Sequence, residues 1–349
     1  MSDVARLAGV SQGTVSKALN GQGQLRSETR DRVLAAASQL GYQPNSLAKR
    51  LLTGRSYMVG VLTTDSIGRF TIPLLTGAED VLGAGQISMI LCESRGDQVR
   101  ERHYLQTLLS RRVDGIIVTG RSSDERPSIG RDLPVPVVYA LTRSTDPDDV
   151  SVLHDDRRGA ALAIEHLADT GRRRIALVAG SVRHLATTNR LAGAHDALER
   201  LGLTLVGSPL HGEWSEEWGR EAAVWLTRQG EAFEGVFCMS DQIARGLTDG
   251  FRELGVRVPE AVGVVGMDNW DIMVNSARPS LTTIDLQLAR LGHIAASLLL
   301  ALIDGEPIEA GVRLVPSSLI MRQSTRMVAG PLRSSVAVSV NAAPAASAP

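Results

Sequence analysis

Aromatic residues are scarce in this chain of 349 residues, where Phe, Trp and Tyr together make up 3% of the sequence. The core must therefore consist mainly of Leu, Val, Ile and Ala, within an ordinary hydrophobic fraction of 43%. Cysteine is rarer still, and Cys92 and Cys238 lie far apart, each in an apolar run. Two separated thiols provide neither a disulfide framework nor a metal knuckle, and they indicate buried free thiols in a reducing compartment.

The chain also lacks the segments that direct a protein into or across a membrane. No basic segment followed by an apolar core opens the sequence. The longest apolar runs are too short or too interrupted to span a bilayer. We therefore expect a cytoplasmic protein with no membrane partner.

The common catalytic signatures are missing from their usual places. No GxGxxG, GxxxxGK[ST] or GxSxG elbow follows a strand-like run, and the seven histidines include no HExxH. We therefore expect no enzyme, no cofactor and no metal site.

Charge is distributed unevenly, although the net charge is only −1. Residues 1–58 contain eight Lys or Arg side chains and three Asp or Glu, whereas the remainder is acidic. A basic head on an acidic body suits a small phosphate-binding module attached to a domain with another task. A merely solvated charged face is the alternative.

Residues 4–16, Val-Ala-Arg-Leu-Ala-Gly-Val-Ser-Gln-Gly-Thr-Val-Ser, carry the most informative pattern. They predict a short helix, a turn at Gly9 and a second helix capped by Ser11. A third helix is predicted over 30–40, with these residues on one face: Val33, Leu34, Ala37 and Leu40. This is the layout of a helix-turn-helix, which makes DNA binding the leading hypothesis.

The second of these helices has a polar side. Val15 and Leu19 are four residues apart and are expected to face the core of the head. The positions left toward the DNA groove or its rim are Gln12, Gly13, Ser16 and Lys17. A glutamine can pair with adenine and a lysine with guanine, whereas Gly13 has no side chain with which to read a base. A polar face without a partner is the alternative.

Two segments carry too little pattern to fold alone. The run 45–52 follows Pro44 and is too short to hold a helix in water, so we expect a linker that orders only against a partner. Beyond Arg326 the periodicity is lost, and residues 327–349 are expected to form a disordered tail.

From Met58 onward, apolar strand-like runs alternate with amphipathic helical stretches. The predicted strands are 58–62, 87–92, 115–119, 135–139, 175–179, 235–239 and 262–265. This alternation favours parallel sheets covered by helices on both faces. The body is too long for one such core, so we expect two lobes with a cleft between them.

Ligands of open α/β folds bind at the carboxyl ends of the strands. Polar or aromatic side chains follow several predicted strands: Asp65, Asp155, Asp156, Ser240, Asp241, Asp268, Asn269 and Trp270. An aspartate in such a place is often only a helix cap, which is the alternative for Asp65 and Asp241.

Several independent motifs occur in a characteristic order. They are residues 3–11, 14–16, 32–37 and 40–45 near the start, and 112–117, 190–193, 264–268 and 279–284 in the body. On these motifs, the chain up to about Arg326 resembles the LacI/GalR (lactose-repressor-like) family of bacterial transcription factors.

The resemblance implies an all-α helix-turn-helix headpiece and an α/β periplasmic-binding-protein-like core of two lobes with parallel sheets. It implies a head at 1–43, a hinge helix or linker at 44–57 and a core at 58–326. One lobe would comprise about 58–155 and 286–312, and the other about 156–285 and 313–326. A homodimer that represses from a near-palindromic operator, under control of a small effector, is expected.

For DNA binding, the resemblance places Gln12, Gly13 and Lys17 at base-reading positions. Other head residues are assigned to phosphates, which position the head without specifying sequence. They are Thr14, Ser16 and Asn20.

Hinge residues Asn45, Ala48 and Leu51 are expected at the minor groove. Leu51 would act there as a wedge between base pairs. The alternative for Leu51 is a linker residue that packs on the body.

For the effector, the resemblance points to Phe70, Asp156, Arg190, Trp214, Ser240 and Asp268. The forked donors of Arg190 and the acceptor oxygens of Asp268 can bridge adjacent hydroxyls of a sugar. We therefore expect a carbohydrate or a sugar derivative. An α/β enzyme, or a solute-binding protein with no DNA role, is the competing interpretation of the same body.

Overall fold

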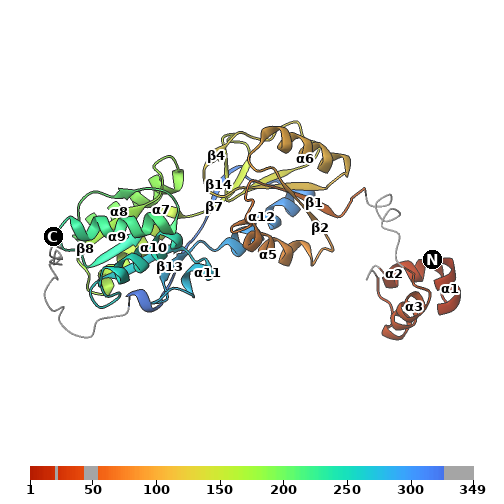
Figure 1. Ribbon diagram of the computed structural model, residues 1–349. Helices are drawn as coiled ribbons and strands as arrows, with labels where there is room; N and C mark the ends of the chain where they lie inside the picture. Colours follow the sequence, from red (N-terminus) through yellow and green to blue (C-terminus); the bar gives the residue numbers. More distant parts are fainter. Residues whose placement is uncertain (20–22, 43–53, 326–349) are drawn as a thin grey trace, which may run out of the picture. The chain divides into compact units, whose positions relative to one another are not determined.

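The computed structural model describes residues 1–19, 23–42 and 54–325 (Figure 1). The chain separates into two compact units, residues 1–57 and 58–349. The predicted hinge helix at 45–52 and the predicted tail lie outside the described residues. So do four of the predicted DNA contacts: Asn20, Asn45, Ala48 and Leu51.

The first unit, called the head, contains helices α1 (Ser2–Ala8), α2 (Gln12–Leu19) and α3 (Ser27–Gln39). Helix α1 ends at Gly9, whose left-handed backbone (φ 63°) turns its N–H back to the carbonyls of the preceding turn. Ser11 then opens α2, because its Oγ accepts a hydrogen bond of 3.1 Å from the backbone N–H of Thr14. The predicted helix-turn-helix is confirmed.

The core of the head is made of small side chains from all three helices. These are Val4, Ala5, Ala8, Val15, Ala18, Val33, Ala36 and Ala37. The prediction for α3 is partly wrong: the helix begins at Ser27, and Leu34 and Leu40 are each 46% exposed. Ala36, which was not predicted to be buried, faces α1 and α2 instead, because alanine lets the three short helices approach closely.

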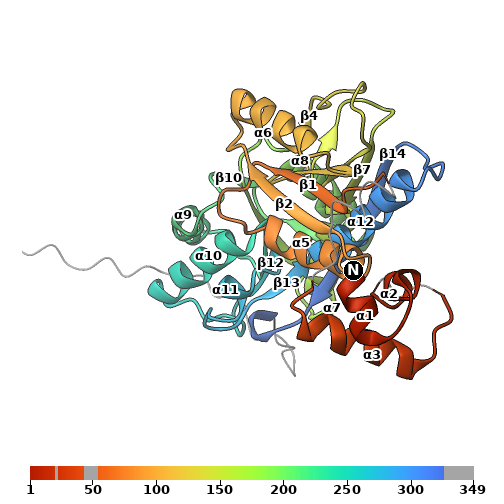
Figure 2. The ribbon, with the colours of Figure 1, turned by 90° about the vertical axis from the view of Figure 1, so that its right-hand side faces the viewer.

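The second unit, called the core unit, contains two large sheets. The first has six parallel strands in the order β14-β7-β5-β3-β1-β2. They are β1 (Met58–Thr63), β2 (Ser88–Glu93), β3 (Gly115–Thr119), β5 (Val137–Ala140), β7 (Val150–His154) and β14 (Gly311–Val315). Helices α5 (Thr71–Leu82) and α12 (Leu288–Ile303) pack on one face, and α6 (Gln98–Ser110) packs on the other (Figure 2). Burial on both faces explains the continuous apolar runs.

The second sheet has the order β10-β8-β11-β12-β13-β15, with β9 paired to β8. Its strands are β8 (Arg174–Ala179), β9 (Thr204–Leu205), β10 (Leu210–His211), β11 (Gly235–Cys238), β12 (Gly263–Asp268), β13 (Thr282–Asp285) and β15 (Ser318–Ile320). Among the described strands, only β15 pairs antiparallel, with β13. A small separate ladder joins β4 (Glu125–Arg126) to β6 (Arg143–Ser144).

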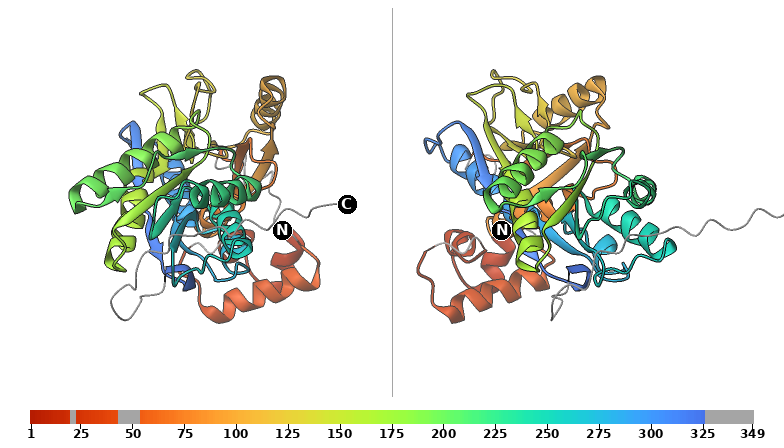
Figure 3. Two further views of the ribbon diagram at one scale, coloured as in Figure 1. Left: turned by 60° about the vertical axis from the view of Figure 1, so that its left-hand side comes forward. Right: turned by 90° about the vertical axis from the view of Figure 1, so that its left-hand side faces the viewer.

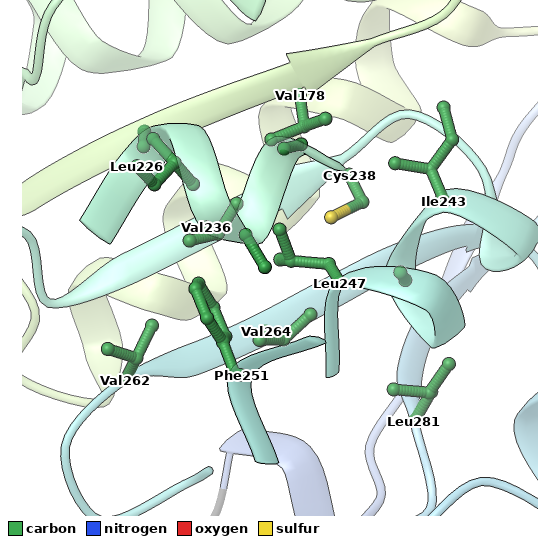
Figure 4. Close-up of a cluster of buried hydrophobic side chains, with 14 of the residues drawn as sticks. Val178, Leu226, Val236, Cys238, Ile243, Leu247, Phe251, Val262, Val264 and Leu281 are labelled. Atoms are coloured by element: carbon green, nitrogen blue, oxygen red, sulfur yellow. The ribbon is translucent and has the colours of Figure 1, made fainter. Parts of the chain in front are cut away.

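Helices cover both faces of the second sheet (Figure 3). They are α7 (Asp156–Asp169) and α8 (Leu185–Leu201) on one face, and α9 (Glu216–Arg228) and α10 (Asp241–Glu253) on the other. Two short helices complete this part, α11 (Asp271–Val274) and η1 (Gln323–Thr325). Figure 4 shows how Leu247 and Phe251 of α10 pack against Val236 and Cys238 of β11.

The two sheets define two lobes, and the chain passes between them three times: after β7, after β13 and after β14. These crossings lie side by side. The N–H of Asp155 donates to the carbonyl of Val315 at 3.0 Å, and Gln287 Nε2 donates to Ser318 Oγ at 2.9 Å. The predicted lobe boundary between 312 and 313 is wrong, because β14 pairs with β7 from Gly311 to Val315. The second lobe resumes only after Val315.

Two further expectations concern composition. Cys92 and Cys238 are free and buried, as predicted. Within the described ranges, no helix combines the length and the apolarity needed to cross a membrane.

The pairing of α5 with α12 depends on two glycines. A Cβ placed on Gly77 would lie 1.7 Å from the carbonyl oxygen of Ala289, and one on Gly292 would lie 1.9 Å from that of Leu74. The two helices therefore meet backbone to backbone, and no other residue type fits either position.

We predict that Gly292→Ala destabilises the core unit by about 1–3 kcal/mol, because the added methyl forces two packed helices apart. Urea unfolding followed by circular dichroism measures the change. Gly13→Ala is the matched control, since a Cβ there would lie 3.7 Å from Ser11 Oγ, in ordinary contact. That control should hold or raise the stability of the head. Unchanged stability of the Gly292 variant would contradict the close crossing.

Candidate functional sites in the head and the interlobe cleft

The outward side of α2 presents polar side chains. Gln12, Gly13 and Lys17 are exposed, and Thr14 and Ser16 are half-buried beside them, while Val15 is buried. Thr14 is additionally held in place, because its hydroxyl lies 2.9 Å from Ser11 Oγ. The described part of the predicted DNA-reading set thus shares one accessible surface, with a gap in it at Gly13.

In the core unit, a buried arginine gathers groups from three elements of the second lobe. Arg190 on α8 donates from Nε to Asp156 Oδ1 at 2.6 Å and from Nη1 to the carbonyl of Met239. Its Nη1 also lies 3.6 Å from Asp268 Oδ1, at the end of β12. Three of the six residues predicted to bind an effector therefore form one ionic cluster, and all three are buried.

Asp156 is held from several sides. Its Oδ1 also lies 2.9 Å from His154 Nε2, and its Oδ2 accepts from Ser123 Oγ at 3.1 Å. Burial alone would raise the pKa of Asp156, but the guanidinium of Arg190 and the ring of His154 hold that pKa well below its usual range. Conversely, the carboxylates beside Arg190 raise the pKa of its guanidinium despite burial. Asp156 and Arg190 therefore both carry their charges.

Arg69, in the loop before α5, reaches this cluster from the first lobe. It donates from Nη1 to Gln242 Oε1 at 2.7 Å and from Nη2 to Asp268 Oδ2. Its guanidinium carbon lies 4.7 Å from the ring centre of Phe70 and 4.4 Å from that of Trp270. Phe70 thus contacts a neighbouring cation, which the sequence interpretation did not include.

Other predicted residues act as helix caps. Ser240 Oγ accepts from the N–H of Ile243 at 3.2 Å and opens α10. Asp65 Oδ2 accepts from the N–H groups of Phe70 and Thr71 and opens α5. Asp241 accepts from the N–H of Trp270 at 2.8 Å, and burial together with the charge of Asp268 raises its pKa. Asp65 is therefore a helix cap, as the alternative interpretation held. Asp241 instead holds the loop after β12 through the N–H of Trp270.

Trp214 lies beside Arg190 of the cluster. Its ring centre is 5.7 Å from the guanidinium carbon of Arg190 and 6.1 Å from the ring of His184. A Cβ on Gly180 would lie 2.2 Å from this indole, so glycine is required for the ring to sit here. Trp214 can offer an apolar face close to the charges, as a sugar ring requires.

A cavity of about 560 Å³ opens beside the cluster. It is bordered by Arg69, Phe70, Asp268, Trp270 and Gln287, among others. Of the predicted effector residues, Phe70 and Asp268 line this cavity, whereas Asp156, Arg190, Trp214 and Ser240 do not. Asp268 is the link, because it borders the cavity and also contacts Arg190.

Sequence reasoning missed the residues that connect the lobes. Arg69 is one, and Asp124 is another: its carboxylate lies 2.7 Å from His184 Nδ1 and accepts from the N–H of Leu185 at 2.7 Å. Arg69 carried one usable signal, since it stands directly before Phe70 in a loop that follows a predicted strand. Asp124 carried none, because it lies in a loop without periodicity. Among the described residues, no cluster of His, Cys, Asp or Glu is arranged to hold a metal ion.

The comparisons with known proteins agree with this organisation. A family described as "Bacterial regulatory proteins, lacI family" matches residues 1–45, and a "Periplasmic binding protein-like domain" matches residues 164–325. Catabolite control protein A of Priestia megaterium is 31% identical over 327 residues, which cover 93% of this chain and 98% of that protein. The transcriptional repressor PurR of Photobacterium profundum is 30% identical over 329 residues, with the same coverage of both chains.

Solved structures give the same result. The lac repressor dimer bound to operator and the anti-inducer ONPF is similar with a TM-score of 0.72 and 28% identity, covering 93% of this chain and 98% of that one. The complex of the transcriptional regulator CelR with cellobiose has a TM-score of 0.63 and 28% identity, covering 92% of this chain and 98% of that one.

We predict that Asp156→Asn destabilises the core unit by about 3–5 kcal/mol, because it leaves the buried Arg190 short of a counter-charge. Asp156 has a lower pKa in the folded than in the unfolded chain, so its contribution is complete above about pH 4 and is lost as the pH falls below that. Urea unfolding at a series of pH values measures both effects, and the variant should lack this part of the acid sensitivity.

The matched control is Asp196→Asn, which breaks an Arg–Asp pair whose side chains are more than half exposed. It should cost less than about 1 kcal/mol. Equal losses in the two variants would show that the buried pair contributes nothing special.

Proposed function

Because this chain belongs to the lacI family of bacterial regulatory proteins, we propose that it is a repressor that binds operator DNA as a homodimer and is controlled by a small effector. The chain is a transcriptional regulator with an effector-binding core and not an enzyme, in agreement with the transcriptional repressor PurR, which matches it along 93% of its length. Operator binding requires access to chromosomal DNA, so we assign the protein to the cytoplasm.

The observation that carries the proposal is the accessible polar side of α2, backed by a core of small side chains. We assign Gln12 and Lys17 to base edges, and Thr14, Ser16 and Asn20 to phosphates. Gly13 occupies a base-reading position without being able to read, so direct readout from the head rests on two side chains. The hinge residues Asn45, Ala48 and Leu51 would add minor-groove contacts, with Leu51 as the wedge.

In the core unit, we assign the effector to the cleft beside Arg190 and Asp268. Among the similar structures, the transcriptional regulator CelR is in complex with cellobiose, a carbohydrate, and the lac repressor is bound to the anti-inducer ONPF. This supports a carbohydrate effector flanked by Phe70 and Trp214, with Asp156 orienting Arg190 and Ser240 close by. An effector that changes the angle between the lobes would alter operator affinity by about 1–3 kcal/mol.

The DNA role is tested with duplexes selected by the full-length protein from a random pool. We expect Lys17→Ala to weaken binding of the selected duplex by about 1–3 kcal/mol, since one base contact is lost. Fluorescence anisotropy at a fixed salt concentration measures the affinity. Arg200→Ala is the control, because it removes an equal charge from an exposed position on α8. If the protein selected no duplex, a solute-binding role without DNA would be favoured.

The effector role is tested with Arg190→Lys, which keeps the charge but loses the fork. We expect this variant to bind the selected duplex normally and to need at least about tenfold more effector for release, equivalent to about 1.4 kcal/mol. The effector is first identified by thermal-shift screening of sugars and nucleobases on the full chain. A normal effector response in this variant would place the effector away from Arg190.

A further inference from the structure

Arg69 joins the two lobes, because it comes from the first lobe and contacts Asp268 and Gln242 of the second. It leaves the first lobe just before α5 and ends between two aromatic rings, Phe70 from its own lobe and Trp270 from the other. Only 11% of its side chain is exposed. Stacking against rings leaves the edge of the guanidinium, where its N–H groups point, as the direction in which a partner can bind.

The hydrogen bonding of this edge is incomplete. Nη1 and Nη2 donate to Gln242 and Asp268, but Nε is buried and has no partner within the described structure. Nε and Nη2 are the two donors on one side of the guanidinium, and together they match the two oxygens of a carboxylate or phosphate. Half of that fork is therefore unused.

The contacts of Asp268 indicate which kind of ligand can bind the Nε and Nη2 donors of Arg69. Both oxygens of Asp268 already face a guanidinium, Oδ2 that of Arg69 and Oδ1 that of Arg190 at 3.6 Å. A neutral hydroxyl that took Oδ2 would leave Arg69 buried without its counter-charge. An acid group can instead replace Asp268 on Arg69, charge for charge, and free Asp268 to accept from hydroxyls.

There is room for such a ligand next to Arg69. The cavity of about 560 Å³ is bordered by Arg69, Asp268 and Trp270. This volume lies within the ordinary range for small-molecule sites, which is about 300–1,000 Å³. Arg69 therefore borders a space large enough for a sugar-sized molecule and also contacts Asp268 of the ionic cluster.

We propose that the effector carries an acid group, a carboxylate or a phosphate, and that Arg69 selects it by binding that group through Nε and Nη2. The rest of the ligand is a polyol whose hydroxyls use Asp268. The proposal rests on the effector cleft assigned above and narrows its ligand to sugar acids or sugar phosphates.

The test uses the full chain at constant ionic strength and ligands in matched sets: a neutral sugar, its sugar acid and its phosphate ester. Glucose, gluconate, glucuronate and glucose 6-phosphate form one set, and the galactose, fructose and ribose series form others. Acetate and inorganic phosphate serve as minimal probes. Calorimetric titration gives each affinity, and the carboxylate and phosphate arms show which acid group is used.

We expect an acidic member to bind at least about tenfold more tightly than its neutral partner. Arg69→Ala should remove that preference, and Arg69→Lys, which keeps the charge but not the fork, should retain part of it. Arg126→Ala is the matched control: Arg126 makes a two-pronged contact with Glu101, at 2.9 and 2.7 Å, outside the cavity. It should keep the full preference. Circular dichroism verifies that each variant is folded.

Three results would overturn the proposal. First, a neutral sugar could bind as tightly as its acid, with its affinity unchanged or raised in Arg69→Ala. The role of Arg69 would then be to hold the two lobes together. Second, an acidic ligand could bind with the same affinity to the unchanged chain and to Arg69→Ala. Third, every acidic ligand, acetate and phosphate included, could fail to show binding that depends on Arg69. Release of operator by a neutral sugar would leave the repressor function standing while this inference fails, whereas absence of DNA binding would reject the function itself.

Discussion

The core unit depends on one constraint, which is that a buried guanidinium must have carboxylates around it. Arg190 supplies the charge, and the partners that balance it come from the start of α7 and the end of β12. Each of these points must stay close to the same side chain, because separating any of them would leave a charge unpaired in a medium that solvates it poorly. The second lobe is therefore pinned at the edge where its strands end, which is the edge a ligand must approach.

Local patterns predicted the elements of this fold well, and tertiary contacts decided what they could not predict. Continuous apolar strands and cap residues placed most strands and helices, because burial on two faces and helix ends leave a signal in the chain itself. Leu34 shows the limit: helical periodicity marked it as buried, but small residues on the neighbouring helices favoured Ala36. The boundary inside β14 failed for a related reason, since only pairing with β7 reveals to which sheet that strand belongs.

The residues of the candidate site also differ in whether the sequence alone could predict them. Asp156 and Asp268 could be identified in advance because each follows a strand, and Arg190 because the family resemblance points to it; the structure brings the three together. The one local signal of Arg69, its place before Phe70, did not reveal its role, because that role depends on Gln242 and Asp268, which are remote in sequence. A single cation from a loop thus changes the chemistry of a cleft that otherwise has the polarity expected of a sugar site.

The glycine crossing between α5 and α12 has a consequence for how the molecule can respond. Helices that touch backbone to backbone have no flexible side chains between them, so the first lobe cannot yield by repacking. We expect the first lobe to move as a rigid body about the three segments of chain that connect it to the second lobe. The size of a ligand in the cleft would then determine the angle between the two lobes at those three crossings, because neither lobe would deform to accommodate it.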